Sequence, residues 1–388
     1  DKIHHIVGKI EMKKLTATSK SQLEFIIKDI IKKSIAYILV IAIFSLTIYS
    51  GDNFYISIDS GAQGYVPSIY TQQWQKAMSW VRENTPENAV FAHWWDYGYW
   101  VQSIGERATI TDGGNVISYW NYFMGRHVLT GTDNQEALEF LYTHNATHLL
   151  MDSTDIIKYA AYSLIGSDET LDRKGIPAII HRENQLTKET KNSTTYFYVG
   201  KTLIVEDIIY EENNTKIFLP GEAAEIEMVI VEKDNLNSSI NQPVGIFSYK
   251  ERQYALPIRY AYYKEFIDFG SGVESGIFLL SRLKPQSQGG NYEEDATLIY
   301  LSKKMVNSQV ARLSLYNEEV PYFKLVHSEE DELVSQLRAQ NLNTESDFVY
   351  YNKLRGPIKI WEINYPEDIE FKEEYLSTDY PEELQLIL

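Results

Sequence analysis

The sequence of 388 residues contains no cysteine, and this absence excludes disulfides, cysteine metal ligands and a thiol nucleophile. It is also poor in cations, with 36 Lys and Arg against 54 Asp and Glu and a formal net charge of −18. Nucleic-acid binding needs clustered cations against the phosphates, so the composition argues against a nucleic-acid partner. A G-x-S-x-G nucleophile motif is missing. The glycine-rich segment 269–276, FGSGVESG, does not have the G-x-G-x-x-G spacing of a dinucleotide-binding loop.

The charge that is present is unevenly distributed. Residues 1–33 hold eight lysines and four acids, whereas 34–51, SIAYILVIAIFSLTIYSG, hold no charged residue. Eighteen residues at 1.5 Å each form a helix of about 27 Å, just enough to span a bilayer. We therefore predict a basic cytoplasmic segment at 1–33 and a transmembrane helix at 34–51. The positive-inside rule places the acidic remainder on the extracellular side of a cell membrane. A buried core helix is the alternative interpretation of the apolar run.

The remaining length is enough for more than one domain. Helix and strand patterns alternate to about residue 166. Short runs of Val, Ile, Tyr and Phe between Gly, Asn and Pro turns then dominate from about 190. These patterns predict an α+β protein, with a mixed α/β core domain at 52–200 and a mainly β peripheral region at 201–388. The first residue is Asp1 rather than Met, which favours a C-terminal piece of a longer protein.

Local patterns predict individual elements of the mixed domain. Trp74, Met78 and Val81 have the i, i+4, i+7 spacing of one helical face. NAVFAHW (88–94), ATIT (108–111) and THLLMD (147–152) are short apolar runs typical of buried strands. Helices are expected after the first and third of these strands. Residues 52–70 are expected to be a juxtamembrane loop, and 284–296, KPQSQGGNYEEDA, an exposed loop.

The segment WWDYGYW (94–100) is the first candidate site. Its turn follows a predicted strand, and ligands bind at the carboxyl ends of strands in α/β layers. Asp96 would act there either as a helix N-cap or as a carboxylate aimed at a ligand. Two adjacent Trp side chains in extended backbone cannot both face one core, so Trp94 or Trp95 is expected to reach a surface or a cleft. Core packing is the alternative for this aromatic stretch.

The second candidate lies in DIIKYAAY (155–162). Asp155, Lys158 and Tyr162 share one stripe of a predicted helix that also follows a strand, so its first turn would approach the same crevice as Asp96. An ordinary ion pair between Asp155 and Lys158 on a solvated helix face is the alternative.

Other motifs are weaker candidates. His144 and His148 have the i, i+4 spacing of helical zinc ligands, but the intervening Asn145 and Thr147 break the helix. The 54 acids leave carboxylate pairs for glycoside hydrolysis open. Four N-x-Ser/Thr sequons follow the apolar run and are possible glycosylation sites, namely Asn145, Asn192, Asn213 and Asn237.

The two candidate motifs together resemble a known family. WWDYG (94–98) resembles the W-W-D-x-G motif of the catalytic subunit of oligosaccharyltransferases, and 155–162 resembles its D-x-x-K-x-x-x-(Met/Ile) motif. The order of a transmembrane helix followed by both motifs is similar too. Residues 312–330 and 356–363 look like the closing segments of archaeal members. The resemblance covers most of the chain.

The resemblance implies roles for individual residues. Trp94, Trp95 and Asp96 would bind the Ser/Thr hydroxyl at the +2 position of the acceptor polypeptide, and Lys158 would line the same pocket. Tyr162 departs from the family pattern, which has Met or Ile packing on the +2 side chain. Either the Tyr162 ring packs there or the register is shifted, and the preference for Thr over Ser depends on which is true.

The resemblance also implies the chemistry. The acceptor Asn attacks C1 of a lipid-linked oligosaccharide with inversion, and Mg²⁺ or Mn²⁺ bound by acidic loops of a membrane domain assists the leaving group. Such loops are not found in this sequence, so we expect no catalytic or metal-binding residue in this chain and no activity of the chain alone. Two other classes remain open. One is a membrane-anchored glycan- or peptide-binding module, and the other is a structural surface protein that buries the Trp pair.

Overall fold

The computed structural model describes residues 2–65, 70–212, 215–285, 292–340, 346–381 and 384. It divides the chain into two compact units, residues 1–69 and 70–388. The first unit is the helix α1 (Lys2–Tyr65). Its segment Ile27–Ile58 is long and apolar enough to cross a membrane. The predicted span 34–51 lies within this segment. The predicted loop at 52–70 is wrong for residues 52–65, because the helix continues through them.

The second unit begins with a mixed part built on a five-stranded sheet of order β15-β18-β3-β1-β2. The strands β2 (Ala108–Thr109) and β3 (His148–Met151) both pair parallel with β1 (Val90–Ala92). The antiparallel strands β18 (Ile358–Ile363) and β15 (Phe323–Glu329) come from the far end of the chain. Residues more than 200 positions apart therefore share one sheet.

Helices cover this sheet and close its core. The helix α2 (Gln72–Asn84) buries Trp74, Met78 and Val81, which confirms the predicted face. Asp133 caps α5 (Asn134–Thr143) by accepting a hydrogen bond from the Gln135 amide at 2.8 Å. The other helical segments of this part are the 3₁₀ turn η1 (Trp95–Tyr97), α3 (Gly98–Ser103), α4 (Ser118–Phe123), the π-helix η2 (Met124–Leu129), α6 (Asp155–Ile165), the π-helix η4 (Ala311–Leu315) and η5 (Glu373–Leu376).

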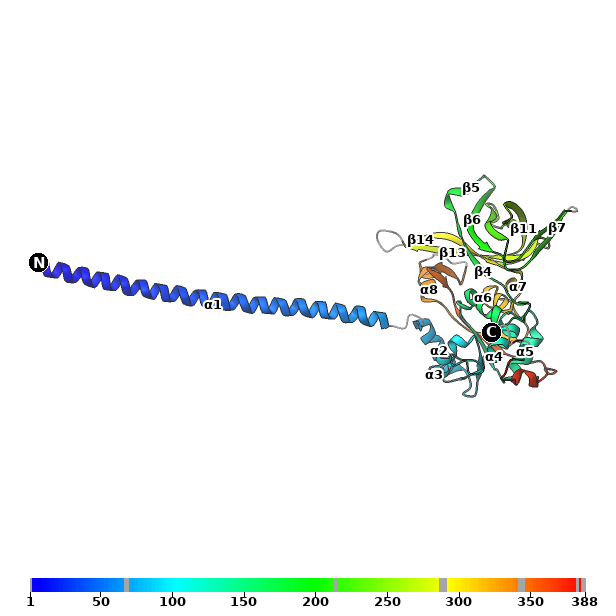
Figure 1. Cartoon of the computed structure of the whole chain (residues 1–388), viewed down its shortest axis with the longest axis horizontal. Helices are drawn as coiled ribbons and strands as arrows, with labels where there is room; N and C mark the ends of the chain where they lie inside the picture. The colour runs from blue at the N-terminus through cyan, green and yellow to red at the C-terminus, as the bar shows by residue number, and fades with distance from the viewer. Residues whose placement is uncertain are drawn as a thin grey trace. The chain divides into compact units, whose positions relative to one another are not determined.

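The mainly β part forms a closed barrel. Consecutive pairings run β11-β10-β9-β6-β4-β14-β13, and a parallel pairing of β13 with β11 returns to the start. The strands curl around this ring at one end of the folded unit (Figure 1). The barrel strands are β4 (Pro177–Arg182), β6 (Ser193–Leu203), β9 (Glu225–Asp234), β10 (Val244–Tyr249), β11 (Arg252–Tyr263), β13 (Val273–Pro285) and β14 (Tyr292–Leu301).

Smaller elements border the barrel. Residues 284–296 were predicted to be an exposed loop. They are strand up to Pro285 and again from Tyr292, and residues 286–291 lie outside the described part. The bordering elements are η3 (Asn184–Leu186), β5 (Lys188–Glu189), β7 (Ile208–Glu212), β8 (Thr215–Leu219), β12 (Glu265–Asp268), α7 (Lys303–Val306), α8 (Glu332–Ala339), β16 (Val349–Tyr351) and β17 (Lys353–Arg355).

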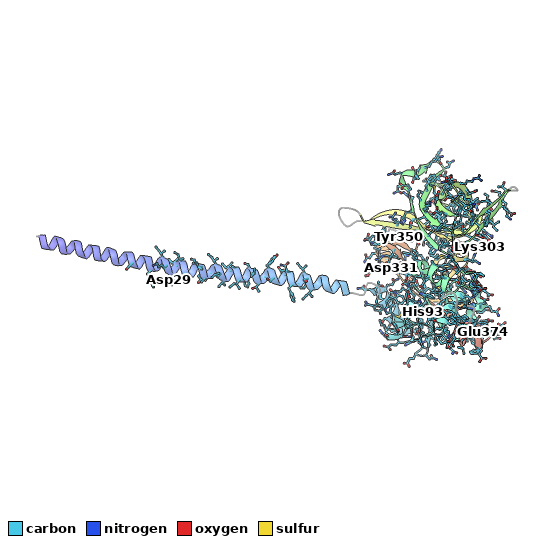
Figure 2. All side chains as sticks on the ribbon, viewed as in Figure 1. Asp29, His93, Lys303, Asp331, Tyr350 and Glu374 are labelled. Atoms are coloured by element: carbon cyan, nitrogen blue, oxygen red, sulfur yellow. The ribbon has the colours of Figure 1, made fainter. Side chains whose placement is uncertain are left out.

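Two large cores fill the unit, and side chains occupy both parts densely (Figure 2). The barrel has its own interior, with Val229, Phe247 and Ile258 fully buried. The mixed part has a larger core that includes Phe278 and Ile299 from the barrel wall, so the two parts share packing. The α+β class is confirmed: one apolar helix precedes a mixed part and a mainly β part. The sheet of the mixed part, however, takes β15 and β18 from beyond the predicted boundary at residue 200.

Candidate acceptor-recognition site

The turn after β1 presents the first motif. Trp94 has extended backbone, with φ −63° and ψ 141°, and residues Trp95–Tyr97 then form the 3₁₀ turn η1. The turn leads directly into α3. Asp96 is in the first turn of η1 and its side chain remains 26% exposed. Strand, turn and helix therefore follow in the predicted order, and the carboxylate lies at the carboxyl end of β1.

Gly98 is required by the close approach of a second loop. A Cβ atom at this position would lie 2.4 Å from the Cβ of Asp112 and 2.8 Å from the Thr111 carbonyl oxygen. The Asp112 loop is held by its own hydrogen bonds, because the carboxylate accepts from the Gly114 amide at 2.8 Å and from the Gln102 side chain at 2.9 Å. Any larger residue at 98 would push η1 and this loop apart.

The second motif begins α6 directly after β3. Asp155 is fully buried there, and its Oδ2 accepts from the Asp152 amide at 2.9 Å. Its Oδ1 accepts from the Tyr97 hydroxyl at 2.7 Å. Burial raises the pKa of Asp155 to about 7, although the nearby Lys158 charge opposes the shift. Asp155 therefore ties α6 to the turn that carries Asp96.

Lys158 joins the two motifs. Its ammonium lies 2.5 Å from Asp96 Oδ2, donates to the Tyr97 hydroxyl at 3.0 Å and lies 4.6 Å from the centre of the Tyr97 ring. The side chain is 30% exposed. The predicted meeting of the two motifs is thus observed. The alternative of a solvated pair between Asp155 and Lys158 is wrong, because Asp155 is buried and bonds Tyr97 instead.

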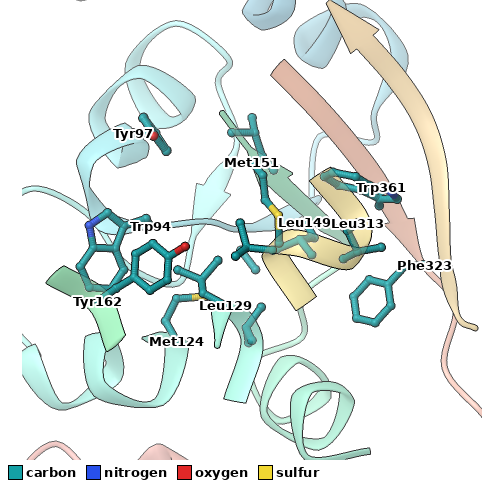
Figure 3. Packing of buried hydrophobic residues seen from close by; sticks show 14 of the residues in the cluster. Trp94, Tyr97, Met124, Leu129, Leu149, Met151, Tyr162, Leu313, Phe323 and Trp361 are labelled. Carbon is teal, nitrogen blue, oxygen red and sulfur yellow. The ribbon is translucent and has the colours of Figure 1, made fainter. Parts of the chain in front are cut away.

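The two tryptophans have different surroundings. Trp94 is buried and its ring lies 5.5 Å from that of Tyr162, in the core cluster that also contains Met124 and Leu129 (Figure 3). Trp95 is only partly buried and packs against the edge of the same core. As expected, one of the pair faces the core and the other reaches toward the surface.

Tyr162 belongs to the core rather than to the surface of the site. It is fully buried, and its hydroxyl donates to the Asp155 carbonyl oxygen at 2.9 Å. Burial raises its pKa well above the usual value, so it stays neutral. The ring of Tyr162 therefore packs against Trp94 and supports the site from within the core.

Two residues of this site, Tyr97 and His93, were not predicted from the sequence. Tyr97 occupies the variable position of W-W-D-x-G, yet its hydroxyl contacts both Asp155 and Lys158. His93 is also fully buried, and its Nδ1 lies 2.8 Å from the Trp94 carbonyl oxygen, so Nδ1 carries the proton. Its Nε2 has no hydrogen-bond partner among the described residues. The position of His93 directly before the motif was the only signal for it.

The remaining candidate residues lie apart from this site. Within the described part of the chain, no group of three or more His, Asp or Glu side chains is arranged to hold a metal ion. His144 follows the end of α5 while His148 is on β3, so the broken helix is confirmed. Asn145, Asn192 and Asn237 are exposed, whereas Asn213 lies outside the described residues.

Comparisons with known proteins agree with these motifs. Residues 87–210 match the model of the STT3/PglB/AglB core domain. Dolichyl-phosphooligosaccharide-protein glycotransferase 1 of Pyrococcus furiosus is 49% identical over 49 residues, covering 12% of this chain and 5% of the relative. Glycotransferase 2 of the same organism is 23% identical over 201 residues, covering 50% of this chain and 24% of the relative.

Solved structures include similar chains. The C-terminal domain of C. jejuni PglB aligns with a TM-score of 0.37 and 11% identity, covering 75% of this chain and 100% of that one. The Archaeoglobus fulgidus oligosaccharyltransferase in complex with Zn and sulfate aligns with a TM-score of 0.31 and 13% identity, covering 76% and 35%. The chain covers at most about a quarter of the curated relatives named above. The predicted resemblance is nevertheless confirmed: residues 87–210 match the STT3/PglB/AglB core domain.

Proposed function

We propose that this chain is the acceptor-recognition region of an oligosaccharyltransferase, which transfers a lipid-linked oligosaccharide to Asn in N-x-Ser/Thr sequons. The observation that carries the proposal is the meeting of the two family motifs, with Lys158 2.5 Å from Asp96 at the carboxyl ends of two parallel strands. In this proposal α1 crosses the cell membrane and the folded unit works on the extracellular side.

The proposed recognition uses Asp96 as a hydrogen-bond acceptor for the +2 hydroxyl. An ionised carboxylate has about four acceptor sites, and the contact with Lys158 involves one oxygen. Because both side chains are partly exposed, an incoming peptide can reach the pair. Trp95 supplies an apolar face at the edge of the core, against which the methyl group of Thr would pack.

Selectivity for Ser or Thr follows because a +2 residue without a hydroxyl would leave the Asp96 carboxylate without a hydrogen-bond donor. An acceptor with Ala at +2 would cover Asp96 without satisfying it, and an unsatisfied buried acceptor costs about 1–3 kcal/mol or more when charged. Sites built around a substrate hydroxyl reject analogues without it for this reason. Lys158 fixes the direction of the Asp96 carboxylate, so the acceptor oxygen is in place before the peptide arrives.

The remaining motif residues position the recognition pair. Trp94 and Tyr162 are buried, so they would act through packing rather than through contact with the acceptor. Tyr97 links Lys158 to the buried Asp155 and holds the ammonium beside Asp96. Asp155 is therefore a positioning residue too.

Group transfer itself is assigned to other parts of the full enzyme. The family implies Mg²⁺ or Mn²⁺, and the described residues of this chain offer no ligand set for either ion. We therefore expect this chain to be inactive alone. Supplying divalent metal, acceptor peptide and lipid-linked oligosaccharide to the 388-residue chain should give no glycopeptide, and turnover would contradict this part of the proposal.

The decisive experiment measures transfer by the full-length enzyme in membranes. Three fluorescent peptides would be compared, carrying Thr, Val or Ala at +2. Val has the shape of Thr but lacks the hydroxyl. The wild type should prefer Thr to Val by at least about a hundredfold in kcat/KM, and Asp96→Asn should remove most of that preference.

The matched control is Asp268→Asn. Asp268 also forms an acid–base pair, with Arg259 at 2.9 Å, but on the barrel surface. This variant should transfer normally and keep the preference for Thr. If Asp96→Asn behaved like the control while both variants kept the wild-type unfolding midpoint, the recognition role of Asp96 would be wrong.

A further inference from the structure

The loop that joins β9 to β10 carries a sequon whose three residues are all exposed. Residues 235–239 are exposed without interruption, and the sequon 237–239 ends this run. Lys233 and Ile240 form an isolated bridge at the base of the loop. Both also line a cavity of about 360 Å³ at the mouth of the barrel, together with tyrosines of the barrel strands. The sequon therefore lies at the rim of the barrel mouth, where another protein can reach it.

The two chemically important side chains of this sequon contact each other. The Oδ1 atom of Asn237 accepts hydrogen bonds from the Ser239 amide at 2.9 Å and from the Ser239 hydroxyl at 2.7 Å. Both bonds use the carboxamide oxygen, so neither occupies the nitrogen that would react with a sugar. Each is a neutral bond worth about 0.5–1.5 kcal/mol, so the loop can give them up at low cost when it enters a binding site.

The sequon at Asn192 is closed at its +2 position. Thr194 is 7% exposed, and its hydroxyl donates to the Asn235 side-chain oxygen at 2.9 Å. Thr194 is also the register partner of Lys233 in the ladder between β6 and β9. The hydroxyl becomes accessible only if β6 separates from β9, which would break several ladder hydrogen bonds. Asn192 is therefore exposed but does not present a complete sequon.

The sequon at Asn145 is closed in a similar way. Ala146 at its centre is 1% exposed. The Thr147 hydroxyl accepts from the Val90 amide at 3.0 Å and lies 2.8 Å from His148 Nδ1. The Thr147 amide donates to the Val90 carbonyl oxygen at 2.8 Å. The +2 residue is therefore tied to the start of β1 and cannot reach a second protein while the sheet is intact.

We propose that Asn237 is a glycosylation site and that the folded chain is itself an acceptor in the proposed reaction. Of the three sequons that the structure describes, this one alone exposes both ends. Asn237 Nδ2 would form a bond to C1 of the oligosaccharide while the bond from C1 to the lipid phosphate oxygen breaks. The phosphate leaves with the electron pair, and the carboxamide nitrogen releases one proton to water. The inference rests on the proposed function, with Ser239 as the +2 residue that Asp96 recognises.

The test starts from folded full-length enzyme made in cells that lack the sugar donor. The enzyme would be incubated in membranes with lipid-linked oligosaccharide and Mn²⁺, digested with trypsin and analysed by mass spectrometry. Trypsin cuts after Lys and Arg, so the three described sequons fall on the separate peptides 127–158, 192–201 and 234–250.

The glycan should appear on peptide 234–250 with an occupancy at least about tenfold above that of the other two. Opening a strand pairing costs more than opening the loop by more than one hydrogen bond, and about 1.4 kcal/mol corresponds to a factor of ten. An unmodified peptide 234–250 would overturn the proposal, and so would equal occupancy of peptide 192–201.

Variants within the loop test whether the +2 hydroxyl selects the site. Ser239→Ala keeps Asn237 but removes the hydroxyl, and it should lower the glycan occupancy at least about tenfold. Ser239→Thr keeps a hydroxyl and should remain modified. The matched control is Ser238→Ala, the same change at the exposed central position, which should also remain modified. Equal occupancy in Ser239→Ala and Ser238→Ala would overturn the proposal.

A fluorescent peptide with Thr at +2, added to the same membranes, separates this inference from the proposed function. Transfer to the peptide but not to Asn237 would refute the glycosylation site and leave the proposed function intact. Transfer to neither acceptor would refute both. Transfer to both, with the loss in Ser239→Ala, is the result that the exposed loop predicts.

Discussion

The Asp96–Lys158 site and the barrel mouth arrange their charged groups differently. In the first, one acid and one cation lie 2.5 Å apart, and Lys158 is tied to a buried network through Tyr97. In the second, Lys233 lies beside the Tyr263 ring at an open cavity that tyrosines line. The first therefore offers a ligand directed hydrogen bonds from a close pair, whereas the second offers aromatic faces around an open space.

The largest effect is expected from replacing Gly98, which should disrupt the first site. Gly98→Ala places a Cβ atom 2.4 Å from the Asp112 side chain, so the turn and the Asp112 loop must separate. Overpacking of this kind costs about 1–3 kcal/mol, and contact with backbone atoms puts it near the upper end. We expect a lower unfolding midpoint and loss of glycan transfer.

Gly51→Ala is the matched control, because an added Cβ there meets no atom within 4 Å. It should leave the unfolding midpoint and glycan transfer unchanged. An equal effect of the two substitutions would contradict the packing argument.

The next effect tests whether the buried network positions the recognition pair. Tyr97→Phe keeps the ring under Lys158 but removes the hydroxyl that bonds Asp155 and Lys158. A hydrogen bond to a charged group contributes about 1.5–3 kcal/mol, so kcat/KM for the Thr peptide should fall roughly tenfold or more. The preference for Thr over Val should fall with it.

A purely structural role for Tyr97 would lower stability and leave that preference intact. Tyr260→Phe is a matched control, since Tyr260 is a partly buried tyrosine of the barrel beside Arg259. It should change neither transfer nor the preference for Thr.

Much of the first site follows from the sequence. The apolar runs predicted β1 and β3, and the helices expected after them placed Asp96 and Lys158 at one edge, where they meet. Local periodicity and the rule for strand ends were sufficient for this, because each element is short and continuous. The sequence also predicted that one of the adjacent tryptophans would reach a surface or a cleft, but not which one. Trp95 is the partly buried member of the pair, and it lies in the 3₁₀ turn rather than in extended backbone.

The rest depends on contacts between distant segments. The pairing of β18 with β3 and the closure of β13 on β11 leave no trace in local patterns, since any apolar strand is a possible partner. The burial of Asp155 was missed for a related reason: its spacing from Lys158 resembles a surface ion pair, and only the position of Tyr97 gives it a different partner. The barrel mouth likewise exists only once the ring is closed.

A third prediction uses pH to separate the buried network from a surface ion pair. Burial raises the pKa of Asp155 from 3.8 to about 7, so the folded protein binds more protons than the unfolded chain between these values. The carboxyl therefore lowers the stability of the folded state as pH rises from about 4 to about 7. Asp155→Asn cannot titrate, so its unfolding midpoint should improve relative to wild type between pH 5 and pH 8.

Asp268→Asn is a control in which the pH dependence of stability should change in the opposite direction. The Arg259 guanidinium holds the pKa of Asp268 below its usual range, so this carboxylate stabilises the folded state at neutral pH and loses that effect in acid. Replacing Asp268 by Asn should lower the stability of the folded state slightly more at pH 7 than at pH 3. Parallel pH curves for wild type and Asp155→Asn would show that Asp155 is ionised and solvated, against the buried network.

The smallest effect tests the first site with salt. Raising the ionic strength from about 0.1 M to about 1 M shortens the Debye length from about 10 Å to about 3 Å. The preference of the proposed acceptor site for Thr over Val should stay within about twofold, because a hydroxyl carries no charge and the Asp96–Lys158 contact is short. A larger loss of that preference would show that the site reads charge rather than a hydroxyl.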